Sequence, residues 1–265
     1  MDMRESRVLR QIRSGKVATS IKLNMADPRI AEIAGLCGFD CIWMDMEHIP
    51  NDYAVIENCI RAAKLSDADI LVRVAKGSYS DFIRPLEMDA AGIMIPHVMS
   101  AEEAKRIVYY TKFHPLGRRP IDGGNADTRY AAVPTANYLK QANEQRFTVI
   151  QIEDPEPMDE LDAICSVEGI DMIFFGPGDF SHGLGVAENP NDERVKEARA
   201  RVAYAARKHG KLAGTVGSVQ NQDELISLGY QFINLGSDLG ALLSSFKKNA
   251  REGSGKDALP NEAFI

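Results

Sequence analysis

Short apolar runs alternate with longer segments of helical period along most of the chain. Eight of these runs have the composition of β-strands and are nearly continuous in apolar residues, which is typical of strands buried on both faces. They are Val17–Leu23, Phe39–Asp45, Asp69–Val74, Gly92–Pro96, Phe147–Ile152, Asp171–Phe175, Lys211–Val216 and Gln231–Leu235. The pattern therefore predicts eight parallel strands.

The segments between the strands are amphipathic. Ala101–Lys112 and Asp192–Gly210 carry apolar residues three or four positions apart, and Gly210 stands where a helix would stop. Strands that alternate with helices imply right-handed parallel crossovers. Eight such units favour an α/β fold of the closed (β/α)8 TIM barrel type, with an open doubly wound sheet as the alternative. No linker is visible, so we expect residues 1–265 to form a single barrel domain.

Two segments interrupt this alternation. The stretch 113–134 is rich in Gly, Pro and Arg and longer than most helix–strand connections, so we expect it to be functional or mobile. The tail from about residue 252 is polar and contains Gly and Pro, which indicates a docking or frayed segment.

Composition narrows the class of partner. The net charge of −7 and the pI near 5.4 argue against nucleic acid, because a phosphate backbone selects clustered Lys and Arg. No apolar run approaches the ~20 residues that span a bilayer, and the first residues lack a signal peptide's apolar core, so we expect a cytoplasmic protein with no membrane partner. The four cysteines lie mostly in apolar stretches, which favours small buried hydrophobes over disulfides or metal ligands.

Two acidic residues stand just past neighbouring strands. Glu153 follows Phe147–Ile152, and Asp179 follows Asp171–Phe175 after a Gly-Pro-Gly bend. Parallel strands place both at the same edge of the sheet, where carboxylate oxygens suit a hard cation such as Mg²⁺ or Mn²⁺. Either residue alone could instead cap a helix. Their equivalent placement on adjacent strands favours metal binding.

Other polar residues are expected at the same edge. Arg73 ends an apolar strand, where its fork geometry fits the carboxylate of a 2-oxo acid; the alternative is an ion pair with an acid of a neighbouring strand. His48 follows Asp45–Glu47 and is a candidate general base beside a metal, or a structural histidine. The Gly176–Gly178 bend lets backbone N–H groups approach a small anion, although such turns are common. His97 and His182 are weaker candidates.

Four motifs stand at these strand ends: Asp45–Asn51 (DMEHIPN), Val72–Arg73, Gln151–Glu153 and Val167–Gly185 (VEGIDMIFFGPGDFSHGLG). Together they resemble the HpcH/HpaI aldolase family of metal-dependent class II pyruvate aldolases, which includes hydroxyoxoheptanedioate and dehydrodeoxyglucarate aldolases. The similarity runs from about Ala18 to Lys247. The resemblance implies a (β/α)8 barrel whose last helix is exchanged between neighbouring subunits, and a homo-oligomer, typically a hexamer built as a trimer of dimers.

The resemblance also implies a role for each site residue. Glu153 and Asp179 would ligate a divalent cation (Mg²⁺, Mn²⁺ or Co²⁺), while Gln151 and the backbone of Gly178 and Asp179 would contact pyruvate. His48 would be the base and Arg73 would stabilise the pyruvate enolate and the developing alkoxide. Glu87 falls where the family has an acid, usually Asp, that raises the basicity of the base.

The implied reaction is the reversible cleavage of a 4-hydroxy-2-oxo acid to pyruvate and an aldehyde. Alternatives are an oxaloacetate decarboxylase, an acyl-CoA or citrate-type lyase or synthase of the same superfamily, and a non-catalytic protein that binds 2-oxo acids.

Two departures from the family concern the aldehyde. Lys22 stands where relatives have a tryptophan, either to bind an anionic aldehyde or to pair with a nearby carboxylate. The altered loop Arg118–Asn125 is expected to rim the aldehyde pocket.

Overall fold

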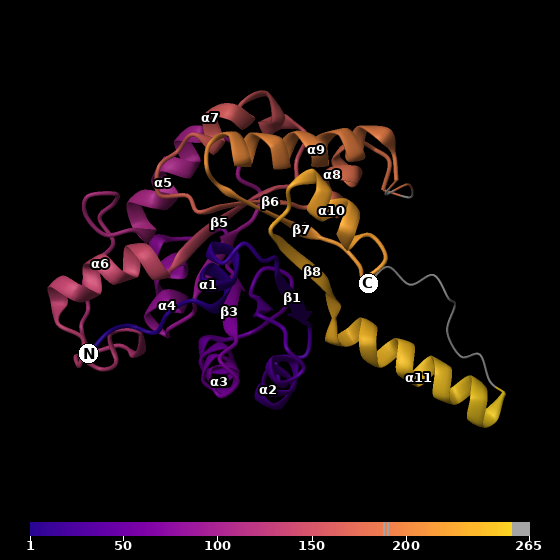
Figure 1. Ribbon diagram of the computed structural model, residues 1–265, viewed down its shortest axis with the longest axis horizontal. Coiled ribbons are helices and arrows are strands. Elements are labelled where there is room, and N and C mark those ends of the chain that lie inside the picture. Colours follow the sequence, from indigo (N-terminus) through magenta and orange to yellow (C-terminus); the bar gives the residue numbers. More distant parts are fainter. Residues whose placement is uncertain (188, 190, 256–265) are drawn as a thin grey trace.

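A closed barrel of eight parallel strands forms the centre of the computed structural model, which describes residues 1–187, 189 and 191–255 (Figure 1). The strands pair in chain order and β8 closes on β1. They are β1 (Ala18–Leu23), β2 (Cys41–Asp45), β3 (Asp69–Arg73), β4 (Gly92–Ile95), β5 (Phe147–Ile152), β6 (Met172–Phe175), β7 (Leu212–Val216) and β8 (Phe232–Ser237). The predicted (β/α)8 barrel is confirmed, and the open doubly wound alternative is excluded.

Helices connect the strands and surround the barrel (Figure 1). They are α1 (Arg7–Arg13), α2 (Pro28–Leu36), α3 (Tyr53–Lys64), α4 (Tyr79–Glu87), α5 (Ala101–Thr111), α6 (Thr135–Gln145), α7 (Leu161–Cys165), α8 (Pro177–Gly183), α9 (Glu193–Lys208), α10 (Gln222–Leu228) and α11 (Asp238–Ser254), with 3₁₀ turns η1 (Ala126–Thr128) and η2 (Glu156–Asp159). Gly210 follows the end of α9 with a φ of 68°, as a helix stop requires.

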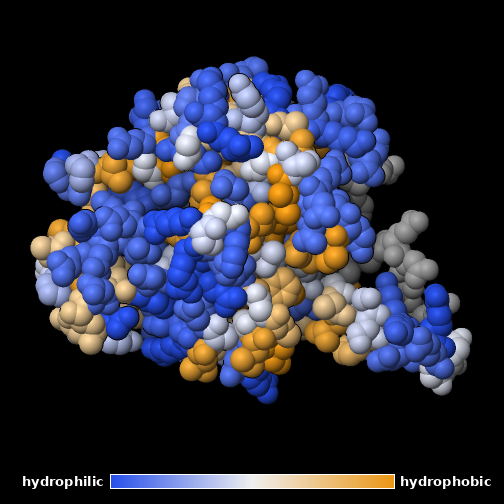
Figure 2. Space-filling model, viewed as in Figure 1, coloured by the Kyte–Doolittle hydropathy of each residue, from blue (hydrophilic) through white to orange (hydrophobic). Residues whose placement is uncertain are grey.

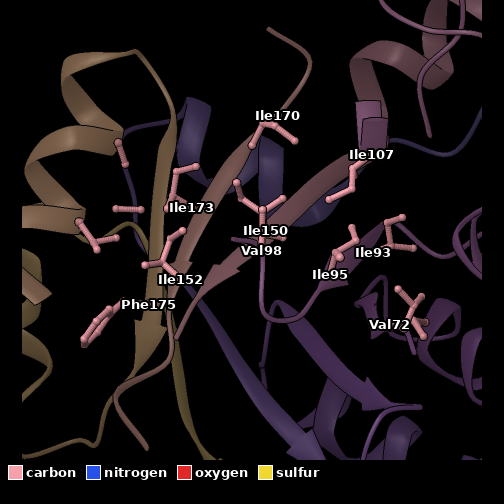
Figure 3. Packing of buried hydrophobic residues seen from close by; sticks show 14 of the residues in the cluster. Val72, Ile93, Ile95, Val98, Ile107, Ile150, Ile152, Ile170, Ile173 and Phe175 are labelled. Carbon is pink, nitrogen blue, oxygen red and sulfur yellow. The ribbon is translucent and has the colours of Figure 1, made fainter. Parts of the chain in front are cut away.

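The alternation of side chains along each strand separates two apolar layers. In β5, Val149 belongs to the cluster inside the barrel, whereas Ile150 and Ile152 belong to the larger cluster between strands and helices. Figure 3 shows this outer layer, in which side chains of β3 to β6 pack with Ile107 of α5. Because successive strand residues face opposite sides, Gln151 and then Glu153 continue the inward series of Phe147 and Val149.

The N-terminal end of the barrel is closed by α1. Val8, Leu9 and Ile12 belong to the inner cluster. The buried carboxylate of Asp69, at the start of β3, anchors this helix by accepting hydrogen bonds from the Ser6 hydroxyl at 2.6 Å and the Val8 N–H at 2.9 Å. Apolar packing thus fills one end of the barrel, and the polar residues of the strands collect at the other.

The long stretch 113–134 is tied to the body by a buried polar cluster. Arg119 donates to Asp127 at 2.9 Å, and the Tyr138 hydroxyl donates to the same carboxylate at 2.7 Å. Both Arg119 and Asp127 are buried. Three consecutive residues, 129–131, have positive φ, so the tip of this segment follows an unusual backbone path.

The remaining expectations concern the tail, the membrane and the cysteines. α11 extends through residue 254, and the rest of the predicted polar tail, 256–265, lies outside the described residues. Within the described part of the chain, no helix has the length and apolar character needed to cross a membrane.

All four cysteines are free thiols; Cys41, Cys59 and Cys165 are buried as expected, whereas Cys37 is exposed.

Candidate active site

Inward-facing polar side chains gather at the C-terminal ends of the strands, which we call the mouth. It is formed by Lys22 of β1, Asp45 of β2, Arg73 of β3, Gln151 of β5, and the residues that follow these strands, notably Glu47, His97 and Glu153. The inward series along the strands places them there, and this is the end of a (β/α)8 barrel where active sites lie.

Arg73 and Lys22 share the buried carboxylate of Asp45. Arg73 donates from Nε at 3.0 Å and from Nη2 at 2.5 Å, and Lys22 Nζ lies 2.8 Å from Oδ2. Burial alone would raise the pKa of Asp45, but the two cations outweigh it and hold that pKa well below its usual range. The sequence offered two partners for each of these cations, a substrate group or a nearby carboxylate. In the structure both pair with the carboxylate of Asp45.

The two cations also lie over Trp43, the single tryptophan of the chain. The Lys22 ammonium is 5.3 Å from the ring centroid and the Arg73 guanidinium carbon 5.1 Å. Contacts of this kind stabilise a desolvated cation. Trp43 and Asp45 together explain how two positive charges are retained inside the barrel.

Glu153 is a buried carboxylate with a fixed orientation. Its Oε1 accepts the backbone N–H of His97 at 2.9 Å, and its Oε2 accepts from Gln151 Nε2 at 2.8 Å. Gly176 packs against it so closely that a methyl group there would lie 2.7 Å from Oε2. Burial raises the pKa of Glu153 to about 7. A bound cation would offset this cost of ionisation.

Asp179 belongs to the first turn of α8, directly after β6. Its side chain is exposed, and its charge contributes to the raised pKa of Glu153. The two carboxylates fit a hard cation that prefers oxygen ligands. No group of three or more His, Cys, Asp or Glu residues suited to a metal is present among the described residues. Waters and substrate would therefore complete the shell, as Mg²⁺ readily allows.

Glu47 connects two of the sequence-predicted residues. Its carboxylate lies 3.0 Å from Arg73 Nη1 and 3.5 Å from His48 Nε2. His48 is largely exposed, with 59% of its side chain accessible to solvent. Glu47 stood among the strand-end residues of the sequence but had no predicted role.

His97 is more central than the sequence suggested. Its Nδ1 lies 2.8 Å from Asp154 Oδ2, and its Nε2 is 3.7 Å from Glu47 Oε1 and 3.8 Å from Glu153 Oε1. Sequence reasoning ranked His97 low and missed Asp154. The signal for Asp154 was its position directly after Glu153 at the end of β5.

Glu87 and Arg119 lie away from these contacts. Glu87 ends α4 and lines a cavity of about 390 Å³ with Tyr53 and Tyr130 among others. Burial raises the pKa of Glu87. No hydrogen bond or ion pair joins it to His48 within the described part of the chain. Arg119, in the loop expected to rim the aldehyde pocket, is buried against Asp127.

Comparisons with known proteins agree with this geometry. The family model described as HpcH/HpaI aldolase/citrate lyase matches residues 21–245. The chain is 31% identical over 263 residues to a hydroxypyruvate/pyruvate aldolase of Pseudomonas aeruginosa, covering 98% of this chain and 97% of that one. It is 32% identical over 227 residues to a 5-keto-4-deoxy-D-glucarate aldolase of Klebsiella pneumoniae, covering 85% and 88%. The crystal structure of an HpcH/HpaI aldolase from Desulfitobacterium hafniense superposes with a TM-score of 0.88 at 28% identity, covering 96% and 97%.

Proposed function

The chain belongs to the HpcH/HpaI aldolase/citrate lyase family, and we propose that it uses a divalent cation to cleave a 4-hydroxy-2-oxo acid reversibly to pyruvate and an aldehyde. It is a carbon–carbon lyase of the pyruvate-aldolase class. The observation that supports the cation is the buried, oriented carboxylate of Glu153. Asp179 follows the adjacent strand, and Arg73 lies at the same end of the barrel.

We assign the cation to Glu153 and Asp179. Mg²⁺, Mn²⁺ or Co²⁺ would supply Lewis acidity toward the keto oxygen of the substrate when bound. Gln151 has a buried amide oxygen without a partner among the described atoms, which suits a contact with the substrate or with a water. Gly178 is exposed, and the position of its missing side chain is open, so the neighbouring backbone N–H groups are accessible to the substrate carboxylate.

Cleavage requires one proton transfer and one place for negative charge. His48 removes the proton from the C4 hydroxyl, and the C4 carbonyl forms as the C3–C4 bond breaks. The electrons of that bond form the C2–C3 double bond, and the keto oxygen takes the negative charge of the pyruvate enolate. Arg73 brings positive charge to the mouth, where the transition state becomes anionic. Protonation of the enolate at C3 gives pyruvate. Glu87 keeps its proposed role toward the base only if another copy of the chain brings the two together, since they do not touch within one chain.

The aldehyde half of the site is assigned to β1 and to the loop Arg118–Asn125. Lys22 retains 20% exposure of its side chain, so its ammonium can meet an anionic group while it pairs with Asp45. Arg119 is committed to Asp127, and Asn125 lines the cavity of Glu87 and Tyr53 rather than the mouth, so the loop would meet an aldehyde only at the mouth of a neighbouring copy. An aldehyde with a carboxylate or phosphate group fits this balance of charge.

A homo-oligomer would cover apolar surface on α11. This helix projects from the barrel (Figure 1) and carries Leu239, Leu242, Leu243 and Phe246 at the spacing of one helical face. Phe246 is 63% exposed. Figure 2 shows further apolar surface over α2 and α3, where Ile33, Leu36 and Leu65 are exposed. We propose that α11 docks on a neighbouring copy of the chain, as the resemblance to hexameric members of the family implies.

Chelation tests the proposal directly. Protein treated with EDTA should release no pyruvate from 4-hydroxy-2-oxo acids in an assay coupled to lactate dehydrogenase, and Mg²⁺, Mn²⁺ or Co²⁺ should restore the rate. Asp179→Ala should stay folded, because the side chain is exposed, and should not respond to the cation. Full activity of the chelated protein would exclude the cation. Binding of pyruvate without turnover of any aldehyde would favour a non-catalytic protein.

A further inference from the structure

The backbone at His97 is in the left-handed conformation. Its φ of 50° lies in a region that only a few per cent of non-glycine residues adopt, most often Asn, Asp and His. His97 stands two residues beyond β4 and directly after Pro96. A conformation of this cost persists only where neighbouring groups hold it in place.

Three contacts hold His97. The backbone N–H donates to Glu153 Oε1 at 2.9 Å, the ring Nδ1 bonds Asp154 Oδ2 at 2.8 Å, and the carbonyl accepts from Lys76 Nζ. Lys76 is itself fixed by Glu103 at 2.8 Å. The next residue, Val98, donates its N–H to the Gln151 carbonyl at 3.2 Å. The turn after β4 is thus fastened to the end of β5 on both sides of the ring.

The contact with Glu153 has a direct consequence for that carboxylate. One oxygen accepts from the His97 N–H and the other from Gln151, so the carboxylate plane is fixed while each oxygen keeps a second acceptor position. Gly176 leaves Oε2 open, since a methyl group at that position would lie 2.7 Å from it. Hydrogen bonds of this kind orient metal-binding carboxylates, and their loss typically lowers metal affinity by about 10- to 100-fold.

We propose that His97 is a positioning residue that orients the Glu153 carboxylate for the cation, and that Asp154 holds His97 in the conformation this requires. The inference rests on the cation role proposed above for Glu153. The bond to Glu153 comes from the backbone of His97. The side chain acts indirectly, because its bond to Asp154 keeps the N–H pointed at Oε1.

The direction in which cation affinity changes on removal of the His97 ring distinguishes a positioning role from a role of the ring's charge. A protonated imidazole 3.8 Å from Glu153 Oε1 repels a cation, so removal of the ring would tighten cation binding if His97 acted through its charge alone. Positioning requires the opposite result, since a turn without its anchor no longer holds the carboxylate.

The test measures Mn²⁺ binding to EDTA-treated, dialysed protein by titration calorimetry, with no turnover involved. His97→Gly keeps access to the left-handed conformation but loses the ring, and Asp154→Ala keeps the ring but loses its anchor. We expect each variant to bind Mn²⁺ at least about tenfold more weakly than wild type. His97→Asn, which tolerates the same backbone and can donate to Asp154, should recover most of the affinity.

A matched pair of variants controls for loss of a histidine–carboxylate contact as such. His209 Nε2 lies 2.9 Å from Asp162 Oδ1 on the outer surface. His209→Gly and Asp162→Ala should therefore bind Mn²⁺ as wild type does. Circular dichroism confirms the fold of every variant, and the partial exposure of His97 and Asp154 makes unfolding an unexpected result.

The outcomes separate this inference from the function it rests on. Wild-type affinity in folded His97→Gly and Asp154→Ala would overturn the positioning role and leave the cation at Glu153 untouched. Tighter binding by His97→Gly would show a role through charge and also overturn it. A wild-type protein that binds no Mn²⁺ would overturn the cation role and the inference together.

Discussion

Asp45 and Arg73 occupy paired positions on neighbouring strands and form a two-point ion pair inside the barrel. Asp45 also accepts the Glu47 N–H at 3.0 Å, so the same carboxylate shapes the turn that carries Glu47 and His48. One buried acid thus sets both the direction of the guanidinium and the course of the chain after β2.

Asp45→Asn should lower the free energy of unfolding while the barrel still folds. The variant leaves Arg73 and Lys22 without their shared negative charge in a buried position, and breaking a buried pair in this way costs about 3 kcal/mol. Urea unfolding measures the loss. Asp67→Asn, which breaks the exposed contact with Arg10, should change stability by less than about 1 kcal/mol. An equal loss of unfolding free energy in the two variants would contradict the stabilising role given to the buried pair of Asp45 and Arg73.

The barrel itself followed from the sequence because buried parallel strands leave a strong local signal. Phe147–Ile152 was predicted with its observed bounds, and the other strands lie within two residues of theirs. Strand order then placed Glu153 and Arg73 at one end. Strand bounds and strand order depend on patterns of neighbouring residues, and a single sequence shows these patterns.

The contacts of His97 and Glu87 could not be predicted in the same way. The left-handed turn at His97 is held by Glu153 and Asp154, which follow β5, and by Lys76, and no local sequence pattern indicates it. Glu87 was expected to serve His48 through the resemblance alone, whereas in the chain it lines a separate cavity with Tyr53. Such contacts depend on how loops from different strands meet.

The metal-free protein should lose stability as the pH rises toward neutrality. Burial raises the pKa of Glu153 from 4.5 to about 7, so the folded state binds this proton more tightly than the unfolded state does. The favourable contribution is complete below about pH 4.5 and is lost as the pH rises to about 7, an effect of the order of 3 kcal/mol. Urea unfolding in EDTA at about pH 5 and pH 7.5 measures it. Glu153→Gln should lack this pH-dependent part of the unfolding free energy. The same pH dependence in that variant as in wild type would contradict the role given to Glu153.

Lys22→Met should separate the two roles considered for Lys22. The variant keeps an unbranched side chain over Trp43 but loses the ammonium that lies near the aldehyde half of the site. If Lys22 binds the aldehyde, kcat/KM should fall about tenfold for aldehydes with a carboxylate or phosphate and change little for neutral ones. A panel of aldehydes condensed with pyruvate measures this. An equal fall for all aldehydes, with lower stability, would identify Lys22 as a partner of Asp45 only.

Phe246→Glu should weaken the assembly without disturbing the barrel. Phe246 extends the apolar face of α11 formed with Leu239, Leu242 and Leu243, and this face lies on a helix that projects from its own barrel (Figure 1). An exposed surface of this kind is costly unless another protein covers it, and a carboxylate at the end of the apolar face opposes that contact. Sedimentation velocity should show a smaller species than wild type, while circular dichroism stays the same. Tyr204→Glu, which replaces an aromatic residue exposed on α9, is the matched control and should leave the assembly intact. An unchanged sedimentation coefficient for Phe246→Glu would exclude α11 from the subunit contact.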